Sequence, residues 1–111
     1  MKELGTIKFG DVSIKVVSNS DLLTVAELYF PSGVAAAIHH HFNEEVNYVV
    51  KGKFETIQDG IPLILEVGDV LQVSSNSNHN LKCISSEDGI VLTAWAPSRI
   101  DIISKLTEND S

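Results

Sequence analysis

The chain has 111 residues, 43% of them hydrophobic, and a formal net charge of -7. This length predicts one domain, residues 1–111, with a single hydrophobic core. The acidic balance, without a cluster of Lys and Arg, argues against nucleic acid or an anionic membrane as a partner. No run approaches the about 18 apolar residues of a membrane span. Because the single cysteine, Cys83, cannot form an intrachain disulfide, we expect a protein of the reducing cytoplasm.

Apolar residues recur with a period of two along most of the chain, which indicates strands and not helices. Turn residues such as Gly, Asp, Asn and Pro separate the alternating segments. The predicted strands span residues 4–9, 12–17, 22–30, 34–40, 45–50, 53–57, 62–67, 70–73, 79–84 and 90–96. About ten short strands with regular turns predict an all-β fold, either a barrel or a jelly roll of two sheets.

One segment near the end has a helical pattern. Between Ser98 and Leu106, the apolar residues Ile102, Ile103 and Leu106 are spaced as on one face of a helix, and Ser98 is a possible N-cap. We therefore predict a short C-terminal helix after the last strand.

Three consecutive histidines, His39, His40 and His41, precede Glu45 by a few residues. In a strand, alternation places His39 and His41 on one face and His40 on the other. Two imidazoles on one face and the Glu45 carboxylate from the next strand make three ligands for a divalent transition metal ion. His79, which stands alone later in the chain, is a candidate for the fourth.

The neighbouring residues bear on how this site is built. Ala35 and Ala37 would share the face of His39 and His41, and their small side chains would leave a cavity in the interior. Glu44 is the alternative to Glu45 if a bend before the next strand breaks the alternation. A role of Cys83 as a fifth ligand is less expected than that of a buried core thiol.

Residues 33–52 have the form G-x5-H-x-H-x3-E-x6-G, which resembles the first motif of the cupin superfamily. Gly68 and His79 fit the second cupin motif, although Ser74, Asn76 and Cys83 occupy its usual proline, glycine and asparagine positions. The resemblance implies a small single-domain cupin, whose fold is a double-stranded β-helix or jelly-roll barrel. It also implies that His39, His41, Glu45 and His79 bind one divalent metal ion per chain. Ni, Zn, Mn, Fe and Co all suit such ligands.

The segment 93–101 is similar to the aromatic-x-Pro-x-Arg-x-Asp segment of small cupins that linearise unsaturated uronates during pectin and alginate breakdown. The resemblance implies that Trp95 and Arg99 line the pocket and act on the substrate. The acidic residue of that family maps onto Thr93, which cannot act as an acid or base. The third metal ligand of that family tends to be glutamine, whereas this chain has Glu45.

Charge predicts the kind of ligand. A divalent ion, one carboxylate and three neutral imidazoles leave a net charge of about +1, which favours an anionic or chelating ligand. Arg99 would reinforce this preference through bidentate pairing with a carboxylate. Alternatively, Arg99 pairs with Asp101 or Glu108 on the surface and contributes little.

Three functions remain open from the sequence. The first is a metal-dependent lyase or isomerase acting on a small carboxylate or sugar acid. The second is an Fe- or Mn-dependent dioxygenase with the same ligands, and the third is a cupin that binds a metal and a small molecule without catalysis.

We also predict a homodimer. The apolar segments 4–9 and 12–17 precede the predicted barrel and have no obvious place inside it. Small cupins commonly pair through such strands, and an unpaired edge strand is an aggregation hazard.

Overall fold

The protein is described by a computed structural model over residues 4–39 and 41–109, with side chains in these ranges except those of residues 37–39 and 107–109. The described residues form ten antiparallel strands and one helix: β1 (Gly5–Phe9), β2 (Val12–Asn19), β3 (Thr24–Phe30), β4 (Ala35–His39), β5 (Glu44–Lys51), β6 (Phe54–Gln58), β7 (Ile61–Leu65), β8 (Val70–Val73), β9 (His79–Cys83), β10 (Gly89–Ala96) and α1 (Ile100–Asn109). Every predicted strand is present, with ends that differ by at most a few residues.

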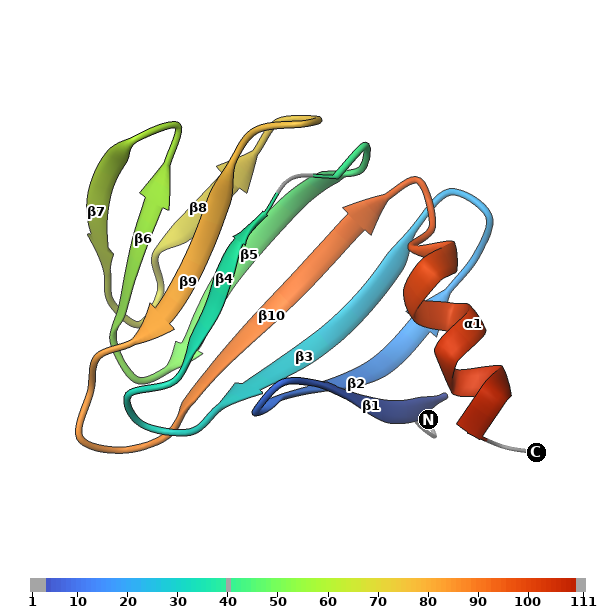
Figure 1. The fold of residues 1–111 in the computed structure, drawn as a ribbon, viewed down its shortest axis with the longest axis horizontal. Helices are drawn as coiled ribbons and strands as arrows, with labels where there is room; N and C mark the ends of the chain where they lie inside the picture. The colour runs from blue at the N-terminus through green and yellow to red at the C-terminus, as the bar shows by residue number, and fades with distance from the viewer. Residues whose placement is uncertain (1–3, 40, 110–111) are drawn as a thin grey trace.

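The strands form two sheets that face each other (Figure 1). The larger has the order β1-β2-β3-β10-β5-β8, and the smaller has the order β4-β9-β6-β7. The last strand, β10, lies in the middle of the larger sheet between β3 and β5. The prediction of an all-β double-stranded β-helix, or jelly roll, with a short C-terminal helix is confirmed.

The core lies between the two sheets, as period-two alternation requires. Glu45, Asn47 and Val49 of β5 are buried, and so are alternate residues of β9 and β10. Phe30 of β3 and Phe54 of β6 join the sheets through an edge-to-face contact with ring centroids 5.1 Å apart. Cys83 is also fully buried, as expected for a core thiol.

The N-terminal strands differ from the prediction. The expectation that they have no place in the barrel is wrong, because β1 and β2 extend the larger sheet next to β3. Their alternating residues Ile7, Val12, Ile14 and Val16 are buried in the common core. These strands therefore need no second copy to cover them, and the homodimer stays a prediction that this structure does not test.

Strand β4 also differs from the prediction, because its alternation is interrupted. The register with β9 shifts between Ala36 and His39, as at a β-bulge. Ala36, and not Ala35, stands opposite the buried Leu81, while Ala35 stands opposite the exposed Lys82. The expected unbroken alternation from Ala35 to His39 is therefore absent, although Ala35 and Ala36 both line the cavity described below; the side chains of Ala37 and His39 lie outside the described residues.

Helix α1 covers the end of β1 (Figure 1) and buries Ile102 and Leu106. Ser98 is not its N-cap, because the helix begins at Ile100 and the Ser98 hydroxyl donates a hydrogen bond of 2.7 Å to Asn19 Oδ1. Ser98 instead ties the start of the C-terminal segment to β2. No helix in the part of the chain described here is long and apolar enough to cross a membrane.

Gly52, in the turn between β5 and β6, has a backbone conformation that other residues rarely adopt. Its φ is 86°, and a Cβ at this position would lie 2.9 Å from Ser85 Oγ and 3.0 Å from Gly89 Cα. Gly60 has a similar φ of 83°, but a Cβ there meets nothing within 4 Å. Alanine substitutions at the two glycines can therefore distinguish the cost of backbone strain, which is present at both, from the cost of steric crowding, which is present only at Gly52.

We predict that Gly60→Ala lowers the free energy of unfolding by about 1 kcal/mol, from strain at positive φ alone. Gly52→Ala should lower it by at least about 1 kcal/mol more, because its methyl group also displaces the β10 backbone. Urea unfolding of both variants measures the difference. Equal losses would contradict the close packing of this turn against Gly89.

Candidate metal centre

Glu45 is a carboxylate in the interior of the sandwich. It follows the exposed Glu44 at the start of β5, and only 5% of Glu45 is exposed. The alternation of β5 therefore resolves the choice between the two glutamates in favour of Glu45.

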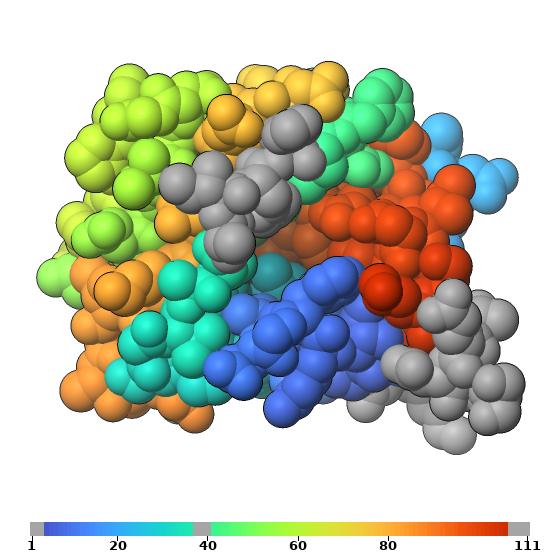
Figure 2. Space-filling view, in the orientation of Figure 1, coloured from blue at the N-terminus to red at the C-terminus, as the bar shows by residue number. Residues whose placement is uncertain are grey.

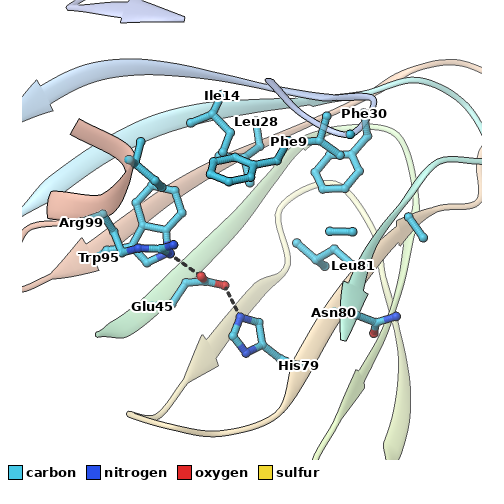
Figure 3. Close-up of a pocket in the computed structure, with 15 residues that line it drawn as sticks. Phe9, Ile14, Leu28, Phe30, Glu45, His79, Asn80, Leu81, Trp95 and Arg99 are labelled. Carbon is cyan, nitrogen blue, oxygen red and sulfur yellow. Dashed lines mark hydrogen bonds and ion pairs between the residues drawn. The ribbon is translucent and has the colours of Figure 1, made fainter. Parts of the chain in front are cut away.

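Two imidazoles from other segments meet this carboxylate. His41 precedes β5 and His79 begins β9. His41 Nε2 lies 3.1 Å from Glu45 Oε1, and His79 Nε2 lies 3.4 Å from Glu45 Oε2. The nearest ligand atoms of the three residues all lie within 4.8 Å of one another. Figure 3 shows Glu45 between His79 and Trp95 at one end of a pocket.

The Nδ1 atom of each imidazole, which does not face Glu45, contacts a backbone carbonyl. His41 Nδ1 lies 2.9 Å from the carbonyl oxygen of Asn43, and His79 Nδ1 lies 2.9 Å from that of Ser77. A carbonyl can only accept, so each Nδ1 carries the proton and each Nε2 faces Glu45. This is the orientation in which a neutral histidine binds a metal ion through Nε2. The donor set therefore fits a divalent transition metal.

The charges at this centre depend on one another. Burial alone would raise the pKa of Glu45, but its contacts with the His41 and His79 imidazoles and the Asn47 amide outweigh burial. The pKa of Glu45 is held well below its usual range, so the carboxylate is ionised. Burial likewise would lower the pKa of His79, but the Glu45 carboxylate and the Ser77 carbonyl raise it. A cation at this point would compensate the same buried negative charge.

The structure brings together three of the four predicted ligands, His41, Glu45 and His79. The side chain of His39 lies outside the described residues, although its backbone pairs with that of His79 in the ladder between β4 and β9. His40, expected on the opposite face, lies outside the described residues altogether.

Three further residues hold Glu45 in place, a role that was not predicted for them from the sequence. Asn47 Nδ2 donates a hydrogen bond of 2.7 Å to Glu45 Oε2, and Trp95 Nε1 donates one of 2.5 Å to Glu45 Oε1. Thr93 Oγ1 donates one of 2.8 Å to Asn47 Oδ1. Asn47 and Thr93 are polar residues at inward positions of strands, a pattern that could have identified them because buried polar groups need partners.

Arg99 lies between the last strand and α1, with its guanidinium 5.0 Å from the centre of the Trp95 ring. It also donates two hydrogen bonds to Asp101, from Nε at 2.9 Å and from Nη2 at 2.8 Å. The guanidinium lowers the pKa of the Asp101 carboxyl. The expected pairing with Asp101 is thus present, yet Arg99 also borders the pocket. Among the described residues, the hydrogen bonds of this guanidinium use two of its five N–H groups, both with Asp101, which leaves three for a ligand.

The cluster of His41, Glu45 and His79 lies at one end of a cavity of about 540 Å³, a size typical of small-molecule sites. Glu45, His79, Trp95 and Arg99 line this end. Residues from the β1–β2 turn and from α1 also line the cavity, and Figure 2 shows a hollow between these blue and red segments. A small molecule inside would therefore contact the centre and Arg99 together.

Comparisons with known proteins agree with this architecture. The model of the family described as "Cupin domain" matches residues 27–95. The chain is 30% identical over 99 residues to the pectin degradation protein KdgF of Dickeya dadantii (strain 3937), a match that covers 86% of this chain and 88% of the relative.

Solved structures are similar as well. An RmlC-like cupin from Shewanella frigidimarina NCIMB 400 is 25% identical, with a TM-score of 0.82 over 88% of this chain and 87% of that one. KdgF from Halomonas sp. has the same TM-score of 0.82 at 23% identity, over 88% of this chain and 90% of that one, and shows the fold.

We predict that His41→Ala abolishes stoichiometric metal binding, because it removes one of the Nε2 atoms that face Glu45. His40→Ala is the control, since His40 is the one histidine of the four that is not a predicted ligand. Elemental analysis of protein purified without an affinity tag measures the metal content of each. Equal loss of metal from both variants would contradict the prediction that His41 faces the interior and His40 the opposite side.

We also predict that Asn47→Leu weakens metal binding by about ten- to a hundredfold, because Glu45 loses the amide that orients it. Thr93→Val is the matched comparison, since it removes the same Thr93–Asn47 hydrogen bond but keeps the amide next to Glu45. Thr93→Val should therefore lose less metal affinity than Asn47→Leu. Competition with a chromogenic chelator gives the two affinities, and a larger loss in Thr93→Val would reject the positioning role of Asn47.

Proposed function

The chain belongs to the cupin domain family, and on that basis we propose that it binds one divalent transition metal ion and acts through it on a small carboxylate or sugar acid. The observation that carries the proposal is the convergence of His41, Glu45 and His79 at one end of a cavity that Arg99 also borders. His39 completes the proposed ligand set, as the resemblance of residues 33–52 to the first cupin motif implies.

A lyase or isomerase reaction on a uronate-like substrate is the activity that these features support best. The 30% identity to a pectin degradation protein favours it, as does the resemblance of the Trp95–Arg99 segment to uronate-linearising cupins. Opening a sugar ring needs polarised oxygens and proton transfer, but no oxidant. A bound divalent ion would supply Lewis-acid polarisation of a hydroxyl or carbonyl oxygen.

The side chains around the proposed metal ion would bind the substrate and hold Glu45 in position. Arg99 binds the substrate carboxylate through the N–H groups that Asp101 leaves available. The Trp95 ring stacks against the Arg99 guanidinium, and the Trp95 indole N–H donates a hydrogen bond to Glu45. Asn47 and Thr93 keep Glu45 in the orientation that faces both imidazoles.

One observation favours a second candidate, a cupin that binds its ligand without catalysis. Thr93 occupies the position of the acidic residue in uronate-linearising cupins, and its hydroxyl is fully buried and donates to Asn47. It therefore cannot exchange protons with a substrate. In this case the cavity would hold a carboxylate at the metal without converting it.

We further propose that residues 1–111 act as one cupin domain in the cytoplasm, as a homodimer, with neither nucleic acid nor membrane as a partner. The net charge of -7 supports the last point. Exposed apolar residues on the outer face of β5, namely Val46, Tyr48 and Val50, offer one surface for a second copy. Sedimentation at micromolar concentration tests the dimer.

The activity is tested by adding an unsaturated uronate to the metal-loaded protein and following loss of the ultraviolet absorbance of its conjugated double bond. The lyase or isomerase proposal expects a rate above spontaneous ring opening that disappears after chelation. An oxygen electrode run in parallel identifies a dioxygenase with the iron-loaded form. Tight binding of the uronate without turnover would support the binding protein instead.

We predict that Arg99→Ala weakens binding of carboxylate ligands by roughly ten- to a hundredfold at equal metal occupancy, because it removes charge-assisted hydrogen bonds worth ~1.5–3 kcal/mol. Asp101→Asn is the matched variant: it weakens the competing ion pair and leaves Arg99 in place, so affinity should stay equal or rise. Calorimetric titration measures both, and unchanged affinity in Arg99→Ala would remove this residue from the site.

A further inference from the structure

The cavity has two chemically different ends (Figure 3). Glu45, His79 and Arg99 lie at one end, where the metal centre is. The walls away from this end come from apolar side chains on β1, β2, β3 and β9, namely Phe9, Ile14, Leu28, Phe30 and Leu81. A ligand that reaches the centre and fills the cavity must therefore place an apolar part against these walls.

The apolar walls offer little to a hydroxyl group. Apart from the polar end, the described lining contains one polar side chain, Asn80, whose amide is directed at the neighbouring strand β6, where Oδ1 accepts a hydrogen bond of 2.7 Å from the backbone N–H of Ile57. Most of the strand backbone around the cavity is paired within its sheet, apart from the register shifts in β2 and β4. A buried hydroxyl without a partner weakens binding by roughly tenfold or more. A sugar acid, with hydroxyls along its whole ring, suits only the polar end.

Phe9 indicates where the apolar part of a ligand lies. It ends β1 beside the turn at Gly10 and lines the cavity, yet 41% of it is exposed. A large aromatic side chain that faces both a cavity and solvent gains burial when an apolar group enters.

We propose that the ligand of this site is a monocarboxylate with an apolar body, an aliphatic chain or a simple ring, and not a polyhydroxylated sugar acid. Its carboxylate lies at the metal centre and Arg99, and its body lies against Phe9, Ile14 and Leu28. This inference rests on the proposed function for the carboxylate anchor. Within that function it selects the small carboxylate, and it argues against the uronate-like substrate that the sequence similarity favours.

The test is a homologous series titrated calorimetrically into protein loaded with one equivalent of Ni²⁺: acetate, butyrate, hexanoate and octanoate, with glucuronate and galacturonate for comparison. Affinity should rise about fourfold per added methylene, the equivalent of ~0.8 kcal/mol, until the chain fills the cavity. Hexanoate should bind at least tenfold more tightly than either sugar acid. A flat series, or tighter binding of a sugar acid, would overturn the proposal.

Two serine variants test where in the cavity the aliphatic chain of the ligand lies. Phe9→Ser removes an apolar wall and should weaken hexanoate binding about five- to tenfold while leaving acetate binding unchanged. Tyr48→Ser is the matched control, because Tyr48 is an aromatic residue of similar exposure, 43%, on the outer face of β5 and outside the cavity lining. It should change neither affinity. Equal effects of the two substitutions, or none from Phe9→Ser, would reject this placement of the ligand body.

Failure of this inference can be told from failure of the proposed function. Elemental analysis of each titrated sample reports metal content independently of ligand affinity. If the protein binds no metal, the proposed function fails, and the series is repeated on the metal-free protein, where Arg99 still provides an anchor and the same dependence on chain length is expected. If metal is bound but chain length has no effect, this inference alone fails.

Discussion

A carboxylate buried between two β-sheets must have its charge compensated, and the arrangement of this site follows from how Glu45 meets that requirement. Its two oxygens are shared among the His41 and His79 imidazoles, the Asn47 amide and the Trp95 indole. These partners come from β5, β9, β10 and the segment before β5. The charge therefore links both sheets at one end of the cavity and orients both imidazole Nε2 atoms towards one point.

The same network extends to the C-terminal segment. Asn43, whose carbonyl orients His41, donates through its side chain to the carbonyl of Pro97 at 2.6 Å. The Arg99 backbone N–H in turn donates to the Thr24 hydroxyl at 2.9 Å. The segment between β10 and α1, which contains Arg99, is thus tied to the segment before β5 and to β3. These contacts explain how an arginine outside the sheets stays over the Trp95 ring. The polar end of the cavity is held by side-chain hydrogen bonds, whereas its other walls are formed mainly by apolar side chains.

Much of the site could be predicted because its information is local. The spacing of His39, His41 and Glu45 lies within one short stretch, and alternation within single strands accounts for the buried side chains of Glu45, Asn47, His79, Thr93 and Trp95. The errors arose where pairing across strands decides the outcome. The alternation from Ala35 to His39 is broken by a register shift against β9. The strands β1 and β2 find their place only by pairing with β3.

The sequence by itself determined the strands, the all-β fold, the family resemblance and the inward-facing candidate ligands, because period-two patterns and short motifs depend on neighbours along the chain. Only the tertiary structure decided which partners those residues meet. The contacts of Trp95 with Glu45, of Thr93 with Asn47 and of Arg99 with both Trp95 and Asp101 depend on β10 lying beside β5 and on the turn into α1. The apolar walls of the cavity likewise come from β1, β2, β3 and β9, strands far apart in the chain that only the packing of two sheets brings together.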